Sequence, residues 1–204
     1  MLKVTHLNVN YGESHVIRDI SFDVNEGETV AIMGRNGMGK TTLFKSLIGI
    51  IPAKSGSILM NGAELSSAKS FERVAKGMAY VPQGRMVFPY LTVEENIRTG
   101  MEAAPNADIP EYIYGTFPVL KEMKDRKGGN LSGGQQQQLV IARALVTNPK
   151  VLLLDEPTEG LQPSIIKDIA KALNKLKQER GFSIIVSEQV LSFTMEIADR
   201  FLII

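Results

Sequence analysis

Hydrophobic and polar side chains alternate along much of the N-terminal third of the chain, a pattern that predicts short strands. The alternation is present over 2–8 and 20–24, and a turn-like stretch follows at 25–28. Residues 57–60 are expected to form another strand, which ends at Asn61-Gly62, a pair typical of a tight hairpin turn. This part of the chain is therefore expected to be rich in β-structure.

Longer, mainly apolar segments then alternate with helical patterns. Buried strands are predicted at 29–33, 78–81, 151–154 and 183–186, with a last strand at 201–204. Helices are predicted at 40–48, 132–146, 164–180 and from the end of the 183–186 strand to 200. This alternation of strand and helix predicts an α/β fold with a largely parallel sheet.

The middle of the chain has a different character. It contains Pro89, Pro105, Pro110 and Pro118, and Thr92–Glu95 forms a capping-box pattern. Short helices joined by loops are expected there. We therefore predict one domain with an inserted helical lobe, in which 1–83 and 148–204 form an α/β core with a β lobe and 84–147 form the helical lobe.

Composition narrows the class of protein. The 204 residues include 23 basic and 22 acidic side chains, so the net charge of +1 gives no electrostatic case for nucleic acid or an anionic membrane. There is no cysteine, which excludes disulfides and thiolate chemistry. No apolar run approaches the ~20 residues of a membrane span, and the N-terminus lacks the apolar region of a signal peptide. A soluble cytoplasmic chain is expected.

A glycine-rich loop between the 29–33 strand and the next helix predicts a phosphate site. Its residues fit G-x-x-x-x-G-K-[ST] and are Gly34, Arg35, Asn36, Gly37, Met38, Gly39, Lys40 and Thr41, followed by Thr42. Backbone N–H groups of such a loop surround a phosphate, and the helix N-terminus adds positive potential. Lys40 is placed to reach the β- and γ-phosphates, and Thr41 to offer its hydroxyl to Mg²⁺. A plain glycine-rich turn is the alternative.

The 151–154 strand is followed directly by Asp155 and Glu156. Ligands of α/β folds bind at the carboxyl ends of the strands. Asp155 is therefore a candidate Mg²⁺ ligand, and Glu156 a candidate base for an attacking water. Taken alone, the two residues before Pro157 also suit an ordinary strand-to-helix turn.

A second helix begins at Ser132-Gly133-Gly134-Gln135. Ser132 and Gln135 have the spacing of a capping box, which is the structural alternative to a binding role. Two adjacent glycines, however, weaken a helix by ~1 kcal/mol each. We therefore expect a ligand to approach this backbone closely.

These motifs, in this order, resemble the ATPase subunits of ABC transporters over essentially the whole chain. The resemblance implies a P-loop NTPase fold with a RecA-like core, an antiparallel β lobe and an inserted helical lobe that carries the signature motif at 131–135. It implies ATP and Mg²⁺ as cofactors, with Lys40, Gln83 and Glu156 catalytic. It also implies that Gln83 contacts Mg²⁺ and faces the transport partner, and that Tyr11 stacks on adenine.

Finer features are similar to the branched-chain amino-acid and urea importer branch. They lie at 80–85, 88–96 and 155–161, while 133–139 and 162–169 are most like urea-transport ATP-binding subunits of the UrtE type. The resemblance implies an importer ATPase, with urea as first choice of solute and branched-chain amino acids or short-chain amides second. These features lie in loops and helices that do not touch the solute, so they indicate ancestry.

Two departures from the family pattern stand out. Most members have a switch histidine near 187–189, where this chain has Glu188, although the importer branch shares Glu-Gln at this point. We expect Glu188 to point away from the γ-phosphate, to meet it through water or a cation, or to be protonated, with Gln189 an alternative for the role of the histidine. Glu188→His is then expected not to lower turnover. Members also usually continue for one or two short elements beyond Ile204.

The resemblance also implies partners. Ser132, Gly133, Gly134 and Gln135 would serve the nucleotide of a second ABC ATPase subunit, a related but different chain in urea-type systems, or a second copy in isolation. Transmembrane permease subunits would hold the protein at the cytoplasmic face of the membrane, with no nucleic acid and no direct contact with the transported solute.

Three alternatives remain open at this stage. A P-loop kinase or nucleic-acid motor is disfavoured by the signature motif and the neutral charge. A soluble ABC ATPase acting on DNA or ribosomes would usually join two cassettes. A subunit that binds nucleotide without hydrolysis is consistent with Glu188 but not with Lys40, Asp155 and Glu156.

Overall fold

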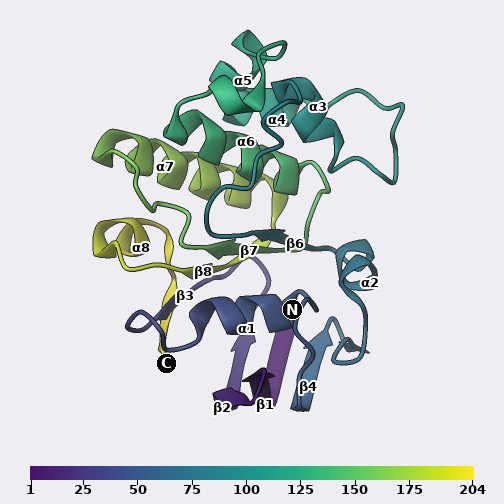
Figure 1. Ribbon diagram of the computed structural model, residues 1–204, viewed down its shortest axis with the longest axis vertical. Helices are drawn as coiled ribbons and strands as arrows, with labels where there is room; N and C mark the ends of the chain where they lie inside the picture. The colour runs from purple at the N-terminus through teal and green to yellow at the C-terminus, as the bar shows by residue number, and fades with distance from the viewer.

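Two β-sheets organise the chain in the computed structural model, which describes residues 1–204. The first sheet is antiparallel with strand order β2-β1-β4-β5. Its strands are β1 (Leu2–Tyr11), β2 (Ser14–Val24), β4 (Ser55–Met60) and β5 (Ala63–Glu64). This sheet lies at the bottom of Figure 1.

The second sheet is parallel throughout and has strand order β6-β7-β8-β3-β9. Its strands are β3 (Thr29–Met33), β6 (Met78–Val81), β7 (Val151–Asp155), β8 (Ser183–Ser187) and β9 (Arg200–Ile203). Because every strand runs in the same direction, all five carboxyl ends meet at one edge of the sheet. Four of these ends are followed by residues of predicted chemical interest.

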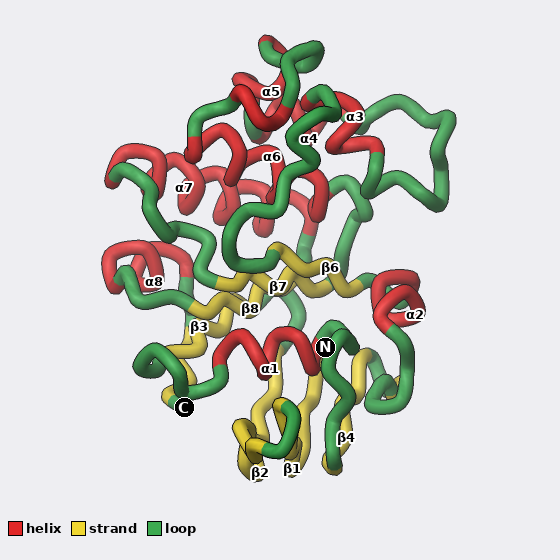
Figure 2. Tube along the Cα trace, in the orientation of Figure 1, coloured by secondary structure: helices red, strands yellow, loops and turns green.

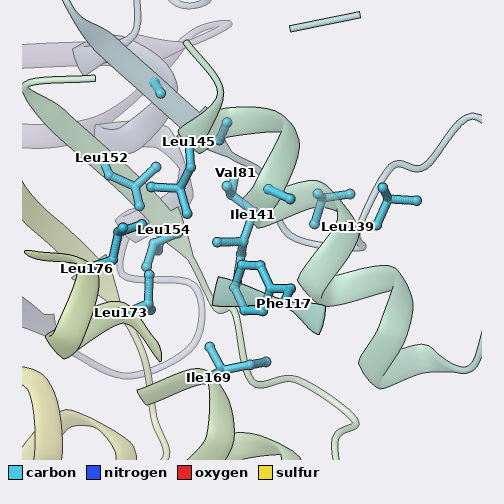
Figure 3. Close-up of a cluster of buried hydrophobic side chains, with 14 of the residues drawn as sticks. Val81, Phe117, Leu139, Ile141, Leu145, Leu152, Leu154, Ile169, Leu173 and Leu176 are labelled. Carbon is cyan, nitrogen blue, oxygen red and sulfur yellow. The ribbon is translucent and has the colours of Figure 1, made fainter. Parts of the chain in front are cut away.

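Continuous apolar strands are explained by burial of both faces of the parallel sheet. In β7, Leu152 and Leu154 belong to one hydrophobic cluster, and Val151 and Leu153 to another. The first cluster joins the sheet to helices on one side, where Leu152 and Leu154 face Ile141 and the helix carrying Leu173 (Figure 3). The second joins it to the antiparallel sheet.

Helices cover both faces of the parallel sheet. The bounds are α1 (Lys40–Leu47), α2 (Ser70–Ala75), α3 (Val93–Arg98), α4 (Glu111–Thr116), α5 (Pro118–Glu122), α6 (Gly133–Leu145), α7 (Pro163–Arg180) and α8 (Leu191–Ile197), with a 3₁₀ turn at Gly128–Asn130. Helix α1 lies between the two sheets, and α6 and α7 lie on the opposite face with α3, α4 and α5 beyond them (Figures 1 and 2). The predicted α/β fold with parallel and antiparallel sheets is confirmed.

One helix, α2, was not predicted, because it buries a charged side chain and exposes its apolar ones. Its buried residue is Arg73, 1% exposed, whose guanidinium donates to the carbonyls of Ser46 and Leu47 at the end of α1. Its apolar residues Phe71 and Val74 are exposed instead. A helix that buries its charge has no apolar stripe for a sequence pattern to detect.

Several boundaries also differ from expectation, most clearly those of the last helix and of β2. The last helix ends at Ile197 rather than near 200, because Ala198 is extended and Arg200 already pairs with β3. Strand β2 begins at Ser14 rather than at Ile20. Its first part was missed because exposed polar side chains there interrupt the alternation of apolar and polar residues. No helix of the chain combines the length and the apolar character that crossing a membrane requires.

Candidate functional site

The strand order brings four polar chain segments together at one edge of the parallel sheet. They follow β6, β7, β8 and β3, which are neighbours in that order. Together with the end of β1 and the start of β2, these segments border an open cavity of about 800 Å³. Its lining consists of Tyr11, Ser14, Val16, Asn36, Gly37, Gly39, Lys40, Thr41, Thr42, Lys45, Gln83, Glu156, Glu159, Gln189 and Val190.

The loop after β3 wraps around the N-terminus of α1. Gly39 caps this helix with φ of 99°, and a Cβ there would lie 2.6 Å from Cγ1 of Val16, so only glycine fits. Lys40 is 5% exposed, and its ammonium donates to the carbonyls of Gly34 at 2.9 Å and Arg35 at 3.2 Å. The loop therefore places a cation and a helix N-terminus at one point, which suits a phosphate.

Asp155 is almost fully buried at the end of β7. Its carboxylate accepts hydrogen bonds from Ser187 at 2.6 Å, Tyr80 at 3.2 Å and Thr41 at 3.3 Å. Burial raises the pKa of the Tyr80 hydroxyl, and the neighbouring Asp155 charge raises it further. Tyr80 thus remains a donor, and the Asp155 oxygens stay in place beside the Thr41 hydroxyl.

The pair formed by Asp155 and Thr41 fits a Mg²⁺ ion bound with a nucleotide. Carboxylate and hydroxyl oxygens are hard ligands, and Mg²⁺ in such sites takes one or two protein ligands and completes its shell with phosphates and water. The chain has no group of three or more acidic or histidine side chains arranged to hold a metal by itself. The donor set therefore suits an ion shared with phosphates.

Glu156 lies at the centre of the polar segments with an unusual backbone. Its φ is 47°, a conformation that non-glycine residues seldom adopt outside functional or tightly held positions. Its carboxylate accepts from Gln83 at 3.1 Å and from Gln189 at 3.0 Å, and lies 3.7 Å from the Lys40 ammonium. Glu156 thus lines the cavity together with two donors and a cation that contact its carboxylate.

Glu188 and Gln189 differ sharply in position, which corrects the assignment of Glu188 to the switch position. Gln189 lines the cavity and donates to Glu156 and to Asn36 at 2.6 Å. Glu188 is 3% exposed, does not line the cavity, and accepts hydrogen bonds from Thr158. Of the sequence-based alternatives, the geometry has Glu188 pointing away and Gln189 facing the site.

Tyr11, which is 63% exposed, is the last residue of β1 and borders the cavity. An accessible aromatic ring at this place is suited to stacking on a flat base. The cavity also includes Lys45 and Glu159, which no sequence motif singled out. Glu159 shares the Gln83 amide with Glu156, at 3.1 Å from each, and only the fold reveals this proximity.

The signature residues lie at the start of α6, outside this cavity. Ser132 and Gln135 form the capping box that the sequence offered as an alternative. A Cβ at Gly134 would lie 2.9 Å from Cγ2 of Ile165, so α7 already requires a glycine here. At Gly133 a Cβ would meet the guanidinium of Arg85 at 3.1 Å. Packing within the chain thus explains Gly134 without a ligand.

Comparison with known proteins identifies the class. The family described as ABC transporter matches residues 17–159. A branched-chain amino acid transport ATP-binding protein, BraG of Pseudomonas aeruginosa, is 40% identical over 203 residues, covering 98% of this chain and 87% of that protein. A probable branched-chain amino acid transport ATP-binding protein, LivF of Archaeoglobus fulgidus, is 37% identical over 98% and 86% of the two chains.

Solved structures agree. A nucleotide-free ATP-binding cassette from an ABC transporter superposes with a TM-score of 0.88 at 26% identity, over 100% of this chain and 87% of that one. The ADP conformation of another cassette gives 0.86 at 27% identity, with the same coverage.

The fold, with its cavity at the strand ends, is thus that of a P-loop ATPase. More particularly, the chain belongs to the ABC transporter family as an ATP-binding subunit. It is an ATP hydrolase that uses ATP and Mg²⁺.

Proposed function

We propose that this subunit powers an importer of the branched-chain amino-acid and urea branch. The observation that carries the proposal is the meeting of the phosphate loop, Glu156 and Gln83 around one cavity, with Asp155 bound to the Thr41 hydroxyl of that loop. Both relatives described above are named for branched-chain amino acid transport. ATP is supplied on the cytoplasmic side, so the subunit would work there, docked on transmembrane permease subunits.

Different residues in and beside the cavity would bind the nucleotide, bind Mg²⁺ and accept a proton during ATP hydrolysis. Lys40 and the N-terminus of α1 would hold the β- and γ-phosphates, with the adenine against Tyr11. Thr41, Asp155 and Gln83 would hold Mg²⁺, which neutralises charge on the transferred phosphoryl group. Glu156 would accept a proton from the attacking water, since its carboxylate is an acceptor and the residue lines the cavity.

The signature residues are assigned to a second subunit's nucleotide. Ser132 and its neighbours lie on the surface at the start of α6, outside the cavity of their own chain. A head-to-tail dimer would bring them to a partner's ATP, and closing and reopening this dimer would move the permeases. The partner is a related ATPase in the urea-type arrangement, or a second copy when the chain is isolated.

Two solutes are to be distinguished. Urea is favoured by the features at 133–139 and 162–169, and branched-chain amino acids by the names of the relatives. The test is uptake of labelled urea and labelled leucine by vesicles that contain the chain, its permeases and its binding protein. ATP-dependent uptake of urea that is lost in Lys40→Ala supports the first assignment. Uptake of leucine alone would replace urea, and uptake of neither would overturn the proposal.

A further inference from the structure

The buried carboxylate of Glu188 is held by four hydrogen bonds. Oε2 accepts from the Thr158 backbone N–H at 3.1 Å and the Thr158 hydroxyl at 2.5 Å. Oε1 accepts from the backbone N–H groups of Gln189 at 2.7 Å and Val190 at 3.1 Å. Glu188 and Thr158 are 3% and 2% exposed. An ionised carboxylate can accept from all four donors at once, whereas an amide or an imidazole cannot.

These bonds connect two segments that carry residues of the site. Thr158 lies two positions after Glu156, and Gln189 lies next to Glu188. The loop between β7 and α7 is also held from its other side, because the Arg85 guanidinium donates to the Glu159 carbonyl at 2.7 Å. Glu188 therefore links this loop to the segment of Gln189, beside the bond that the Glu156 backbone N–H donates to the Ser187 carbonyl at 2.9 Å.

The backbone conformation of Glu156 has to be held in place by the residues around it. A glutamate with φ of 47° is strained, and such a conformation persists only where its surroundings fix it. Glu156 and Gln189 also have to remain within hydrogen-bond reach, 3.0 Å here. A shift of the loop by a fraction of this distance would turn the Glu156 carboxylate away from a water in the cavity.

We propose that Glu188 is a positioning residue whose carboxylate clasps Thr158 and thereby holds Glu156 and Gln189 in the geometry for ATP hydrolysis. This inference rests on the proposed roles of Glu156 and of the cavity. The clasp acts on the step of water attack and not on nucleotide affinity, because neither Glu188 nor Thr158 lines the cavity.

The competing explanation is purely structural, since Oε1 of Glu188 also binds the backbone at the start of α8. Thr158→Val separates the two explanations. It removes the hydroxyl of the clasp, keeps the shape of the side chain, and leaves the contacts of Oε1 intact. Thr158→Ser retains the hydroxyl and serves as the conservative rescue.

A matched control lies far from the site. Thr116 in the helical lobe also donates its hydroxyl, to the Tyr112 carbonyl at 2.7 Å. Thr116→Val therefore removes one hydroxyl hydrogen bond, here to a backbone carbonyl, without touching the clasp.

The experiment measures kcat and KM for Mg-ATP and the thermal midpoint of the full chain and its variants. We expect Thr158→Val to lower kcat by ~10-fold and Glu188→Gln by at least as much, with KM within about threefold of the wild type. Thr158→Ser and Thr116→Val should keep the wild-type kcat.

Two results would overturn the clasp. One is a wild-type kcat in both Thr158→Val and Glu188→Gln. The other is an equal fall in kcat and thermal midpoint in Thr158→Val and Thr116→Val. A wild-type chain that hydrolyses no ATP would instead refute the roles assigned to the site itself.

Discussion

At the scale of single residues, Gln189 is the side chain that takes the place expected for a switch histidine. Its amide donates to Glu156 at 3.0 Å and Asn36 at 2.6 Å. A histidine with a protonated Nε2 can also donate, whereas leucine cannot. We predict that Gln189→His keeps turnover within about threefold, and that Gln189→Leu lowers it by ~10-fold or more, in steady-state ATPase assays. Equal turnover in both variants would remove Gln189 from the mechanism.

The structure also reverses the expectation for Glu188→His. An imidazole cannot accept the four hydrogen bonds that Glu188 receives, so this change should lower turnover and stability together. The sequence placed an acidic residue at this point but did not reveal which of two neighbours faces the cavity. That distinction depends on the direction of each side chain where β8 ends, which no motif encodes.

At the scale of elements, the start of α6 shows how packing and function overlap in one motif. Gly134 lies against Ile165 of α7, while Gly115 in α4 has nothing within 4 Å of an added Cβ. We predict that Gly115→Ala raises the free energy of unfolding by ~0.5–1 kcal/mol through helix propensity. Gly134→Ala should instead lower it by ~1 kcal/mol or more through overpacking.

Chemical denaturation measures both changes. Gly134→Ala combined with Ile165→Ala tests the cause, because the second change removes the methyl group that the new Cβ would meet. Stability should then recover relative to Ile165→Ala alone. A Gly134→Ala variant as stable as Gly115→Ala would show that α7 tolerates a side chain there.

Helices and strands were predictable from the sequence where their apolar side chains recur with the period of the element and are the buried ones. The predicted ranges of the parallel strands and of helices α1, α6 and α7 lie close to the observed bounds. The strands are apolar on both faces, and each of these helices has one clearly apolar face. Helix α2 was not, since it buries Arg73 and exposes Phe71. Glu159 was likewise not predicted as a residue of the cavity, because its position beside Gln83 depends on the pairing of β6 with β7.

At the scale of the whole molecule, an exposed apolar segment follows the cavity residue Gln83. Within it, Tyr90 is 84% exposed, Met86 63% and Phe88 47%, and Cζ of Arg143 lies 5.1 Å from the centroid of the Phe88 ring. Exposed apolar side chains clustered in this way are typical of protein interfaces. We expect the segment 86–91 to dock the permease.

Tyr90→Glu tests this surface without disturbing the core. It should leave ATP binding intact and reduce co-purification of the permease by ~10-fold or more, as loss of an aromatic interface residue does. Met195 on α8 is similarly exposed, at 66%, so Met195→Glu is the matched control and should co-purify normally. Undiminished recovery of the permease with Tyr90→Glu would place the interface elsewhere.

We infer that Glu156 is the base of an ATP site built from neighbouring strand ends. The most direct measurement is ATP binding and turnover of Glu156→Gln beside Glu159→Gln, a matched change in the same cavity that contacts the same Gln83 amide. Glu156→Gln should bind Mg-ATP with wild-type affinity and lose ~10²–10⁴-fold in kcat, the usual contribution of a general base. Glu159→Gln should lose less than about tenfold, because its carboxylate is not the base. Unchanged turnover in Glu156→Gln, or a larger loss in Glu159→Gln, would contradict the assignment.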